Sequence, residues 1–251
     1  SDLDRVTTPA TENLFDQHQK GSKKVLDKSK SECFHTTVAK GLFVSKRARP
    51  DIQLTVSHLC TRVKQPTVSD WDKLVRMMKY LNGTRRKVLT LSADNLRIIK
   101  WYVDASFAVH DDYKSHTGAV MTFGNGAVQS ISRKQKLNTK ASTEAELVGA
   151  DDASVMILWT KLFMEHQGYQ VDQNILYQDN ESAILLEKNG RKSAGKRSRA
   201  LNVRYYFLTD QVEQKNLIIE HCPTDNMWAD YNTKPLQGQK FVIFRDKLLG
   251  D

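Results

Sequence analysis

The stretch Ile98-Ile99-Lys100-Trp101-Tyr102-Val103-Asp104-Ala105-Ser106 decides the fold. Its first six residues mix β-branched and aromatic side chains, which is typical of a buried strand. Asp104 stands where this strand should end, and a carboxylate in such a place must be paired, hydrated or bound to a metal ion. An Asp at a strand end can also simply cap a turn, and this segment alone leaves the two interpretations even.

Three later carboxylates change that balance. Asp179 ends a second apolar run at residues 175–178, Glu146 lies inside a long predicted helix at 142–167, and Asp230 stands at the start of a helical segment. If the fold brings the four acids together, their repulsion requires divalent cations, and oxygen ligands select Mg²⁺ or Mn²⁺. Two such ions about 4 Å apart can activate a water and stabilise the leaving oxygen of a phosphodiester. The acids therefore predict two-metal hydrolysis without a nucleophilic side chain.

The long helix carries two candidate acids, of which only one can face the core. Glu144 and Glu146 are separated by about 200° of helix rotation, so they lie on opposite sides. Glu146 shares its side with the small or apolar Ala150, Ala153 and Ile157. We therefore expect Glu146 to point inward and Glu144 to act as a charge at the helix N-terminus.

Composition describes a folded, basic protein. The 251 residues carry a net charge of +9 and are 39% hydrophobic, which favours a polyanionic partner. The three cysteines lack the spacing of a zinc site, and no run of about 18 apolar residues exists, so no membrane span is expected. The start of the chain has no initiator Met and no signal-peptide core, which indicates a piece of a longer chain.

The period of the apolar residues divides the chain into three parts: a flexible lead-in at 1–31, a helical module at 32–95 and an α/β part at 96–251. Within the module, helices are expected at 34–43, 52–63 and 69–81, the last with its apolar face formed by Trp71, Leu74, Val75, Met78 and Leu81. Strands are expected at 88–91, 96–103, 117–123 and 127–132. The last three would form an antiparallel meander with a hairpin around Gly124-Asn125-Gly126, followed by alternating helices and strands.

Four motifs together resemble one known family. They are 101–106 (Trp-Tyr-Val-Asp-Ala-Ser), 142–147 (Ser-Thr-Glu-Ala-Glu-Leu), 177–180 (Tyr-Gln-Asp-Asn) and 229–236 (Ala-Asp-Tyr-Asn-Thr-Lys-Pro-Leu). In this order they resemble the RNase H domain of copia-type (Pseudoviridae) retrotransposon Pol polyproteins, over roughly residues 98–250. Residues 34–95, with the motifs at 45–52 and 78–84, resemble the thumb and connection region that precedes it. The Tyr-x-Asp-Asp polymerase motif is absent.

The resemblance implies an RNase H-like fold and hydrolysis of the RNA strand of RNA–DNA hybrids during reverse transcription. Asp104, Glu146, Asp179 and Asp230 match the family's metal-binding acids, which would hold two Mg²⁺ or Mn²⁺ ions. It also implies a polymerase partner from the same polyprotein and a location in cytoplasmic virus-like particles and the nucleus; the oligomeric state stays open.

Residues beside these acids are candidates for substrate contacts. Ser142, Asn180 and Glu181 would contact the minor groove. The basic loop 191–199, with Lys192, Lys196 and Arg197, is either solvated or a phosphate clamp, and the clamp is favoured. His221 would aid product release, although its place on a strand favours a packing role.

Three departures from the family keep a second hypothesis open. Glu181 stands where Gln is common, Asn232 where Phe is usual, and residues 200–202 read Ala-Leu-Asn instead of His-Ile-Asp. The alternative is a catalytically weak or inactive RNase H-fold module that binds nucleic acid and supports a polymerase or a host-adopted role. Integrases and proofreading exonucleases are disfavoured because their acids follow a different order.

Overall fold

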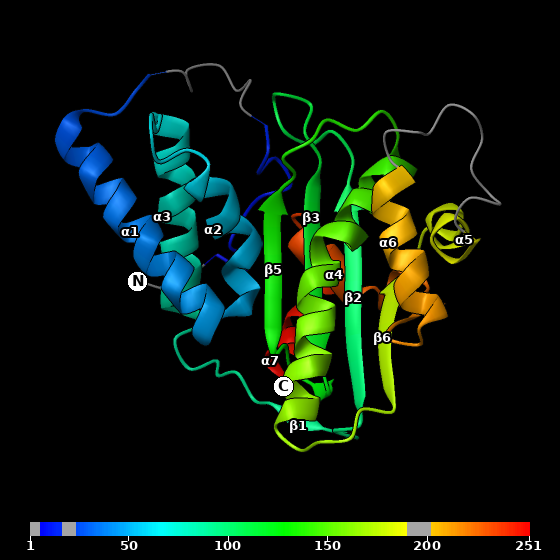
Figure 1. Cartoon of the computed structure of the whole chain (residues 1–251). Coiled ribbons are helices and arrows are strands. Elements are labelled where there is room, and N and C mark those ends of the chain that lie inside the picture. The colour runs from blue at the N-terminus through cyan, green and yellow to red at the C-terminus, as the bar shows by residue number, and fades with distance from the viewer. Residues whose placement is uncertain (1–5, 17–23, 190–201) are drawn as a thin grey trace.

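The computed structural model describes residues 6–16, 24–189 and 202–251 (Figure 1). Its α-helices are α1 (Lys28–Arg47), α2 (Gln53–Cys60), α3 (Val68–Gly83), α4 (Ser142–His166), α5 (Glu181–Asn189), α6 (Asn202–Glu213) and α7 (Gly238–Leu249). Its strands are β1 (Ser92–Ala93), β2 (Ile98–Ser106), β3 (His116–Thr122), β4 (Gly124–Asn125), β5 (Gln129–Lys134), β6 (Gln173–Gln178) and β7 (Ile218–His221). Short 3₁₀ helices are η2 (Pro50–Ile52), η4 (Thr224–Asn226) and η5 (Trp228–Asn232).

A five-stranded mixed sheet with the order β5-β3-β2-β6-β7 forms the centre of the protein. β2, β3 and β5 pair antiparallel, as the predicted meander requires, whereas β6 and β7 run parallel to β2. The strand that opens the meander is thus central, and the later parallel strands extend the sheet on its other side. This confirms the predicted α/β class with an RNase H-like strand arrangement.

Helix α4 covers one face of the sheet (Figure 1). Trp101 and Val103 of β2 are fully buried in a core that also contains Ala150, Ala153 and Ile157 of α4. Small side chains on α4 allow the helix to approach the sheet closely, so the large Trp101 fills the space between the two layers. This packing turns the side of α4 that carries Glu146 toward the end of β2.

The opposite face of the sheet shares its core with the helical module. Phe34 of α1 and Leu74 of α3 belong to the same buried cluster as Val120 of β3 and Phe241 and Phe244 of α7. The two parts predicted from the change of period are therefore joined by apolar burial, which is the main stabilising term in folding. We propose that residue 96 begins the α/β part of the chain, directly after the helical module.

The outer edge of β5 is closed by side chains of the helical module. Ser57 Oγ donates to the Ser132 carbonyl at 2.7 Å, and Lys46 Nζ donates to the Ser130 carbonyl at 2.7 Å. An edge strand otherwise presents a row of unpaired main-chain groups. α1 and α2 thus take the place of a further strand.

A buried network joins the two motifs of the helical module. Arg49 donates to both carboxylate oxygens of Asp51 at 2.8 and 2.7 Å, and Tyr80 Oη donates to Asp51 at 2.6 Å. Arg49 also donates to the carbonyl and the hydroxyl of Thr84, at 3.1 and 2.7 Å. A bidentate Arg–carboxylate pair has a defined geometry, so the network fixes the end of α3 against η2.

The structure differs from the expectations for the first part of the chain at four points. The described part of the lead-in is packed, because Leu14 is buried against Leu54 and Phe15 contacts His58 edge-on. α1 begins at Lys28, where Asp27 caps it by accepting a hydrogen bond from the Lys30 N–H.

The predicted strand at 88–91 is extended chain without sheet pairing, since the Thr90 N–H donates instead to the Leu249 carbonyl of α7. The buried side of α3 contains Leu74, Met77 and Tyr80 rather than Val75 and Met78, because Tyr80 turns inward to reach Asp51. Among the described residues, no helix is long and apolar enough to cross a membrane.

Candidate metal centre

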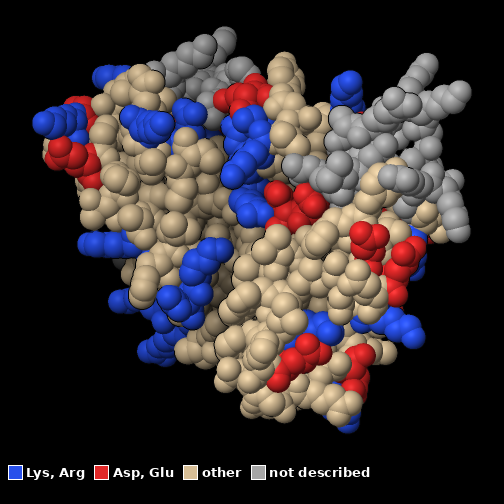
Figure 2. Space-filling view, in the orientation of Figure 1, with Lys and Arg blue, Asp and Glu red and all other residues tan. Residues whose placement is uncertain are grey.

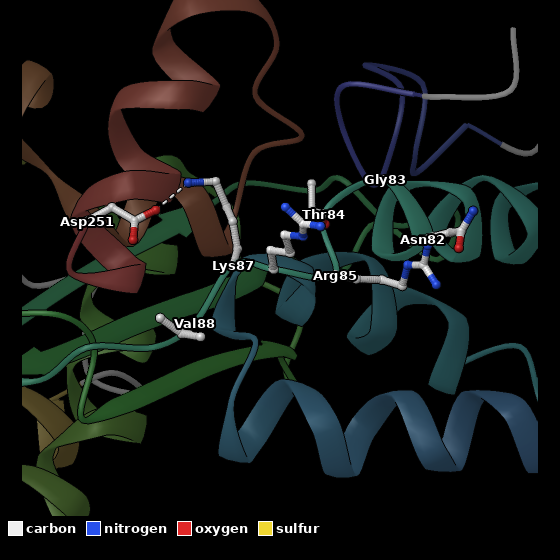
Figure 3. Close-up of a pocket in the computed structure, with 8 residues that line it drawn as sticks. Asn82, Gly83, Thr84, Arg85, Lys87, Val88 and Asp251 are labelled. Atoms are coloured by element: carbon white, nitrogen blue, oxygen red, sulfur yellow. Dashed lines mark hydrogen bonds and ion pairs between the residues drawn. The ribbon is translucent and has the colours of Figure 1, made fainter. Parts of the chain in front are cut away.

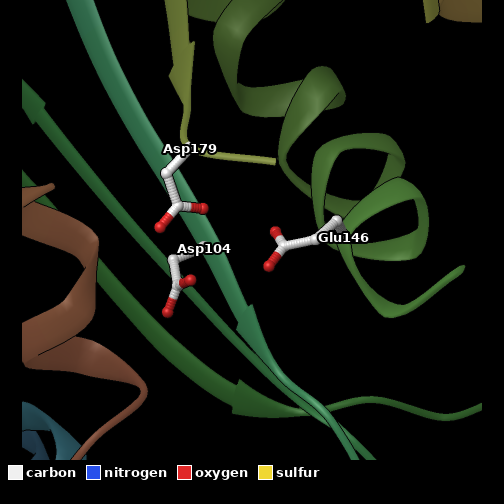
Figure 4. Close-up of side chains that lie close together, drawn as sticks. All are labelled: Asp104, Glu146 and Asp179. Carbon is white, nitrogen blue, oxygen red and sulfur yellow. The ribbon is translucent and has the colours of Figure 1, made fainter. Parts of the chain in front are cut away.

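Three of the four predicted acids meet at one end of the sheet (Figure 4). Asp104 lies near the end of β2, Asp179 directly follows β6, and Glu146 projects from the second turn of α4. Each offers a carboxylate oxygen, and these oxygens all lie within 4.8 Å of one another. Because β2 and β6 are adjacent and parallel, their carboxyl ends meet at the same edge.

Burial makes this cluster costly without a counter-charge. Asp104 is 2% exposed and Glu146 is 5% exposed. Burial, opposed by the charge of Lys234 and reinforced by neighbouring carboxylates, raises the pKa of Asp104 to about 6. Burial and the charges of Asp104 and Asp179 raise the pKa of Glu146 well above its usual value. Like charges held this close favour protonation or cation binding.

The donor set fits a divalent cation. Glu146 Oε2 is buried and has no hydrogen-bond partner among the described residues. The other two carboxylates are held from outside the cluster: Thr233 Oγ1 donates to Asp104 Oδ2, and Thr224 Oγ1 donates to Asp179 Oδ2 at 3.0 Å. Mg²⁺ and Mn²⁺ bind carboxylate oxygens that are held in a fixed orientation and are free to coordinate. The three carboxylates therefore fit either ion.

Asp230, the fourth predicted ligand, does not belong to this three-acid cluster. It lies in η5, where Lys234 Nζ contacts its Oδ1 at 2.6 Å and Lys240 Nζ contacts its Oδ2 at 3.2 Å. Lys234 Nζ also lies 3.5 Å from Asp104 Oδ2. Lys234 is therefore shared between the cluster and Asp230.

Gly118 allows η5 to reach the cluster. It pairs with Asp104 across the β2–β3 ladder. A Cβ atom at Gly118 would lie 2.8 Å from the Ala229 carbonyl oxygen and 2.7 Å from Thr233 Cγ2. Only a residue without a side chain permits this approach, which brings the Thr233 hydroxyl to Asp104.

The remaining predicted site residues that the structure describes have different local roles. Ser142 begins α4 and is exposed. Asn180 Oδ1 accepts a hydrogen bond from the Ala183 N–H at 3.0 Å, which caps α5, and the exposed Glu181 opens that helix. Lys192, Lys196 and Arg197 lie outside the described residues.

His221 ends β7 beside Gln178 and is exposed, so the packing role that its strand position favoured is wrong. Asn232, the departure from the usual Phe, is buried and donates to the Ala119 carbonyl at 3.1 Å and to Ser130 Oγ at 3.0 Å. The amide nitrogen at this position is therefore satisfied by two hydrogen bonds, whereas Asn232 Oδ1 is buried without a partner among the described residues.

Sequence reasoning missed the residues that hold the acids in place. Lys234 stands four positions after Asp230, a spacing that places two side chains on one helical face and could have indicated the pair. Thr224, Thr233 and Lys240 carry no comparable signal, because their contacts depend on how η4, η5 and α7 pack against the sheet.

The chain is similar in sequence to parts of several longer proteins. The Pol polyprotein from transposon TNT 1-94 of Nicotiana tabacum is 29% identical over 214 residues, which cover 85% of this chain and 16% of that protein. The Pol polyprotein from transposon RE2 of Arabidopsis thaliana is 31% identical over 80% of this chain and 14% of its own length. The Ty1-NL2 Gag-Pol polyprotein of Saccharomyces cerevisiae is 23% identical over 82% of this chain and 12% of its own length. The chain thus spans about one seventh of the length of these relatives. No protein-family model matches it.

Two solved structures are similar in part. LC11-RNase H1 superimposes with a TM-score of 0.40 at 15% identity, over 55% of this chain and 93% of its own. The prototype foamy virus protease–reverse transcriptase superimposes with a TM-score of 0.39 at 13% identity, over 64% of this chain and 26% of its own. Both TM-scores lie below 0.5. The fold and the site therefore rest on this protein's own strand order and acid cluster.

Proposed function

The chain is a relative, over about four fifths of its length, of one stretch of copia-type retrotransposon Pol polyproteins, and on that premise we propose that it is a metal-dependent RNase H-type endonuclease. Its substrate would be the RNA strand of RNA–DNA hybrids formed during reverse transcription. The observation that carries this proposal is the convergence of Asp104, Glu146 and Asp179 from three separate elements.

In this proposal the three acids bind a divalent cation, Mg²⁺ or Mn²⁺. When bound, such ions lower the pKa of a water and stabilise the developing charge on the leaving oxygen of a phosphodiester. The protein's part is orientation: Thr233 and Thr224 fix the carboxylates of Asp104 and Asp179, and burial of Glu146 excludes bulk water from its side of the site.

A second ion would lie between Asp104 and Asp230, where Lys234 Nζ now contacts both carboxylates. Binding there requires the ammonium group to move, and 41% of the Lys234 side chain is exposed, so it has room to turn toward solvent. We propose that Asp230 becomes a ligand only after Lys234 has left.

The substrate would lie across this edge of the sheet. Ser142, Asn180 and Glu181 stand next to cluster residues and would face the minor groove, with Lys192, Lys196 and Arg197 holding phosphates and His221 aiding product release. Figure 2 shows that Lys and Arg side chains gather over the helical module, which suits a polyanionic partner. The partner protein would be the polymerase portion of the same polyprotein, in cytoplasmic particles and the nucleus.

The test is cleavage of a labelled RNA–DNA hybrid with Mg²⁺ or Mn²⁺, comparing the unmodified chain with Asp179→Asn. Glu144→Gln is the matched control, because it removes an acid from the same end of α4 on the side away from the cluster. We expect hybrid-specific cuts in the RNA strand that Asp179→Asn abolishes and Glu144→Gln retains. Cleavage that survives Asp179→Asn would refute the assignment.

A specific observation favours the alternative function as well. Two lysines neutralise Asp230, so one of the four acids has its charge balanced without metal. In the alternative the chain is a catalytically weak or inactive module that binds nucleic acid. Tight, salt-sensitive hybrid binding without cleavage by the unmodified chain would support it.

A further inference from the structure

An open pocket with a volume of about 670 Å³ lies where α3 ends and the chain leaves the helical module (Figure 3). Its lining residues come from the segment 82–88 and from Asp251, and none of them belongs to the acid cluster. Val88 supplies the only apolar side chain among them. Three cationic side chains, Arg85, Arg86 and Lys87, line the pocket beside one carboxylate, Asp251, so its charge favours an anionic ligand.

Two cations of the pocket have no counter-charge within the described part of the chain. Lys87 is paired with Asp246 at 3.1 Å and with Asp251, the pair drawn in Figure 3. Arg85 and Arg86 are exposed, and none of the described residues forms an ion pair with them. The pocket therefore keeps a net positive charge after its internal pairing, which calls for an anion.

The wall that carries these arginines is fixed from behind. Arg49, 6% exposed, donates to both the carbonyl and the hydroxyl of Thr84, and Asp51 holds the guanidinium in place. The Thr84 N–H donates to the Tyr80 carbonyl, which ends α3 at the residue before Arg85. Arg85 and Arg86 thus start from an anchored turn, so less entropy is lost when they bind a ligand.

Polar donors at the rim match the recognition of phosphate. Arginine presents a planar fork that pairs with phosphate oxygens, and Asn and Thr side chains are frequent donors to nucleic-acid backbones. Asn82 lies beside Arg85 in the pocket, and both are exposed (Figure 3). An open volume of this size admits a phosphodiester together with its sugars.

We propose that this pocket binds backbone phosphates of the nucleic acid, through Arg85 and Arg86, as a second contact besides the acid cluster. The proposal rests on the proposed function, because it assumes the same nucleic-acid substrate. The pocket stands beside the segment that leads into β1, before the start of β2, whereas Asp104 lies near the end of β2. The two sites would therefore hold different stretches of one nucleic acid.

The test is equilibrium binding of a labelled RNA–DNA hybrid in EDTA, so that cleavage does not enter, over a series of salt concentrations. For Arg85→Ala/Arg86→Ala we expect about tenfold weaker binding or more at 0.1 M salt. The slope of log K against log salt should fall by roughly 1–2, because each lost phosphate contact contributes about 0.9. Arg85→Lys/Arg86→Lys should keep the slope and recover part of the affinity.

The matched control is Lys28→Ala/Lys30→Ala, which removes the same charge from exposed positions in the first turn of α1. It should leave the slope within the error of the unmodified chain. Equal slopes for the arginine variant and the unmodified chain, or equal losses in both double variants, would overturn the pocket. The separate cleavage assay distinguishes failure of the proposed nuclease function from failure of the pocket proposal. A chain that shows this binding pattern but does not cut the hybrid would support the pocket and contradict the nuclease function.

Discussion

The Tyr231 hydroxyl donates a 3.0 Å hydrogen bond to the main-chain carbonyl of Asp51, across 180 positions of sequence. Both residues are buried, and Tyr231 directly follows Asp230. The bond therefore ties the segment beside the acid cluster to the network of Arg49 in the helical module.

Removing that hydroxyl should weaken the whole fold. Tyr231→Phe deprives a buried carbonyl of a partner, and we expect the free energy of unfolding to fall by about 1–2 kcal/mol. Urea unfolding measures it. Tyr113→Phe is the control, because Tyr113 is 75% exposed; the same loss there would show that the effect is not the buried bond.

Neutralising the acid cluster should stabilise the protein without metal and abolish its response to metal. Glu146→Gln removes a buried charge next to Asp104 and Asp179, so at pH 8 in EDTA the melting temperature should rise by about 2–4 °C for each kcal/mol gained. Saturating Mn²⁺ should raise the melting temperature of the unmodified chain and of Glu144→Gln, but not of Glu146→Gln. A Glu146→Gln protein that still responds to Mn²⁺ would place the ion elsewhere.

Two buried histidines should make stability depend on pH. Burial lowers the pKa of His110 to about 4 and of His116 to about 3, and their ring nitrogens lie 3.0 Å apart. In acid the unfolded chain, with a histidine pKa near 6.5, binds more protons than the folded chain. The contribution of these histidines to the free energy of unfolding is therefore fully present above about pH 6.5 and is lost as the pH decreases toward 4. Each histidine should cost about 2 kcal/mol between pH 7 and pH 5.

The comparison that isolates this effect is the pH slope of the unmodified chain against that of His116→Asn. Asp104, with its raised pKa, contributes with the opposite sign, because the folded state binds its proton more readily. That contribution is present in both proteins and cancels in the difference. Identical slopes would exclude His116 as a source of acid sensitivity.

Two glycines near the cluster should respond oppositely to alanine. Gly118→Ala places a methyl group 2.8 Å from the Ala229 carbonyl oxygen, so η5 must shift; we expect about 1–3 kcal/mol of destabilisation and slower hybrid cleavage. The nearest atoms to a Cβ at Gly149 in α4 belong to Ala105 and Thr117, at 3.5–3.6 Å, which is ordinary contact. Gly149→Ala also gains helix propensity, so stability should be unchanged or higher by up to about 1 kcal/mol. Chemical denaturation of the two variants under the same conditions measures the difference.

The acids could be found in the sequence because their signals are local. Asp104 and Asp179 each follow an apolar strand, and the side of α4 that carries Glu146 is visible in the spacing of small residues. Their convergence could not be derived from the sequence, because it depends on β6 pairing parallel to β2 and on how α4 packs against the sheet.

What the sequence did not reveal depends on contacts between distant segments. The pairing of Asp230 with Lys240 requires α7 to pack beside η5. The spacing of apolar residues places Val75 on the buried side of α3, because the hydrogen bond that turns Tyr80 inward to Asp51 cannot be seen in the sequence. Residues 6–16 are polar in composition, yet Ala10 and Leu14 are buried against Leu54, and Thr8 bonds to Gln237 and Arg76.

The cover over β5 has a practical consequence for dividing this protein. A fragment beginning at residue 96 would retain every strand of the sheet and all four acids, yet it would lose Lys46 and Ser57 and bare the carbonyls of Ser130 and Ser132. Such a strand recruits strands from other molecules. The shorter piece should therefore associate with other copies through the exposed edge of β5. In the longer chain the helical module covers this edge and prevents such pairing.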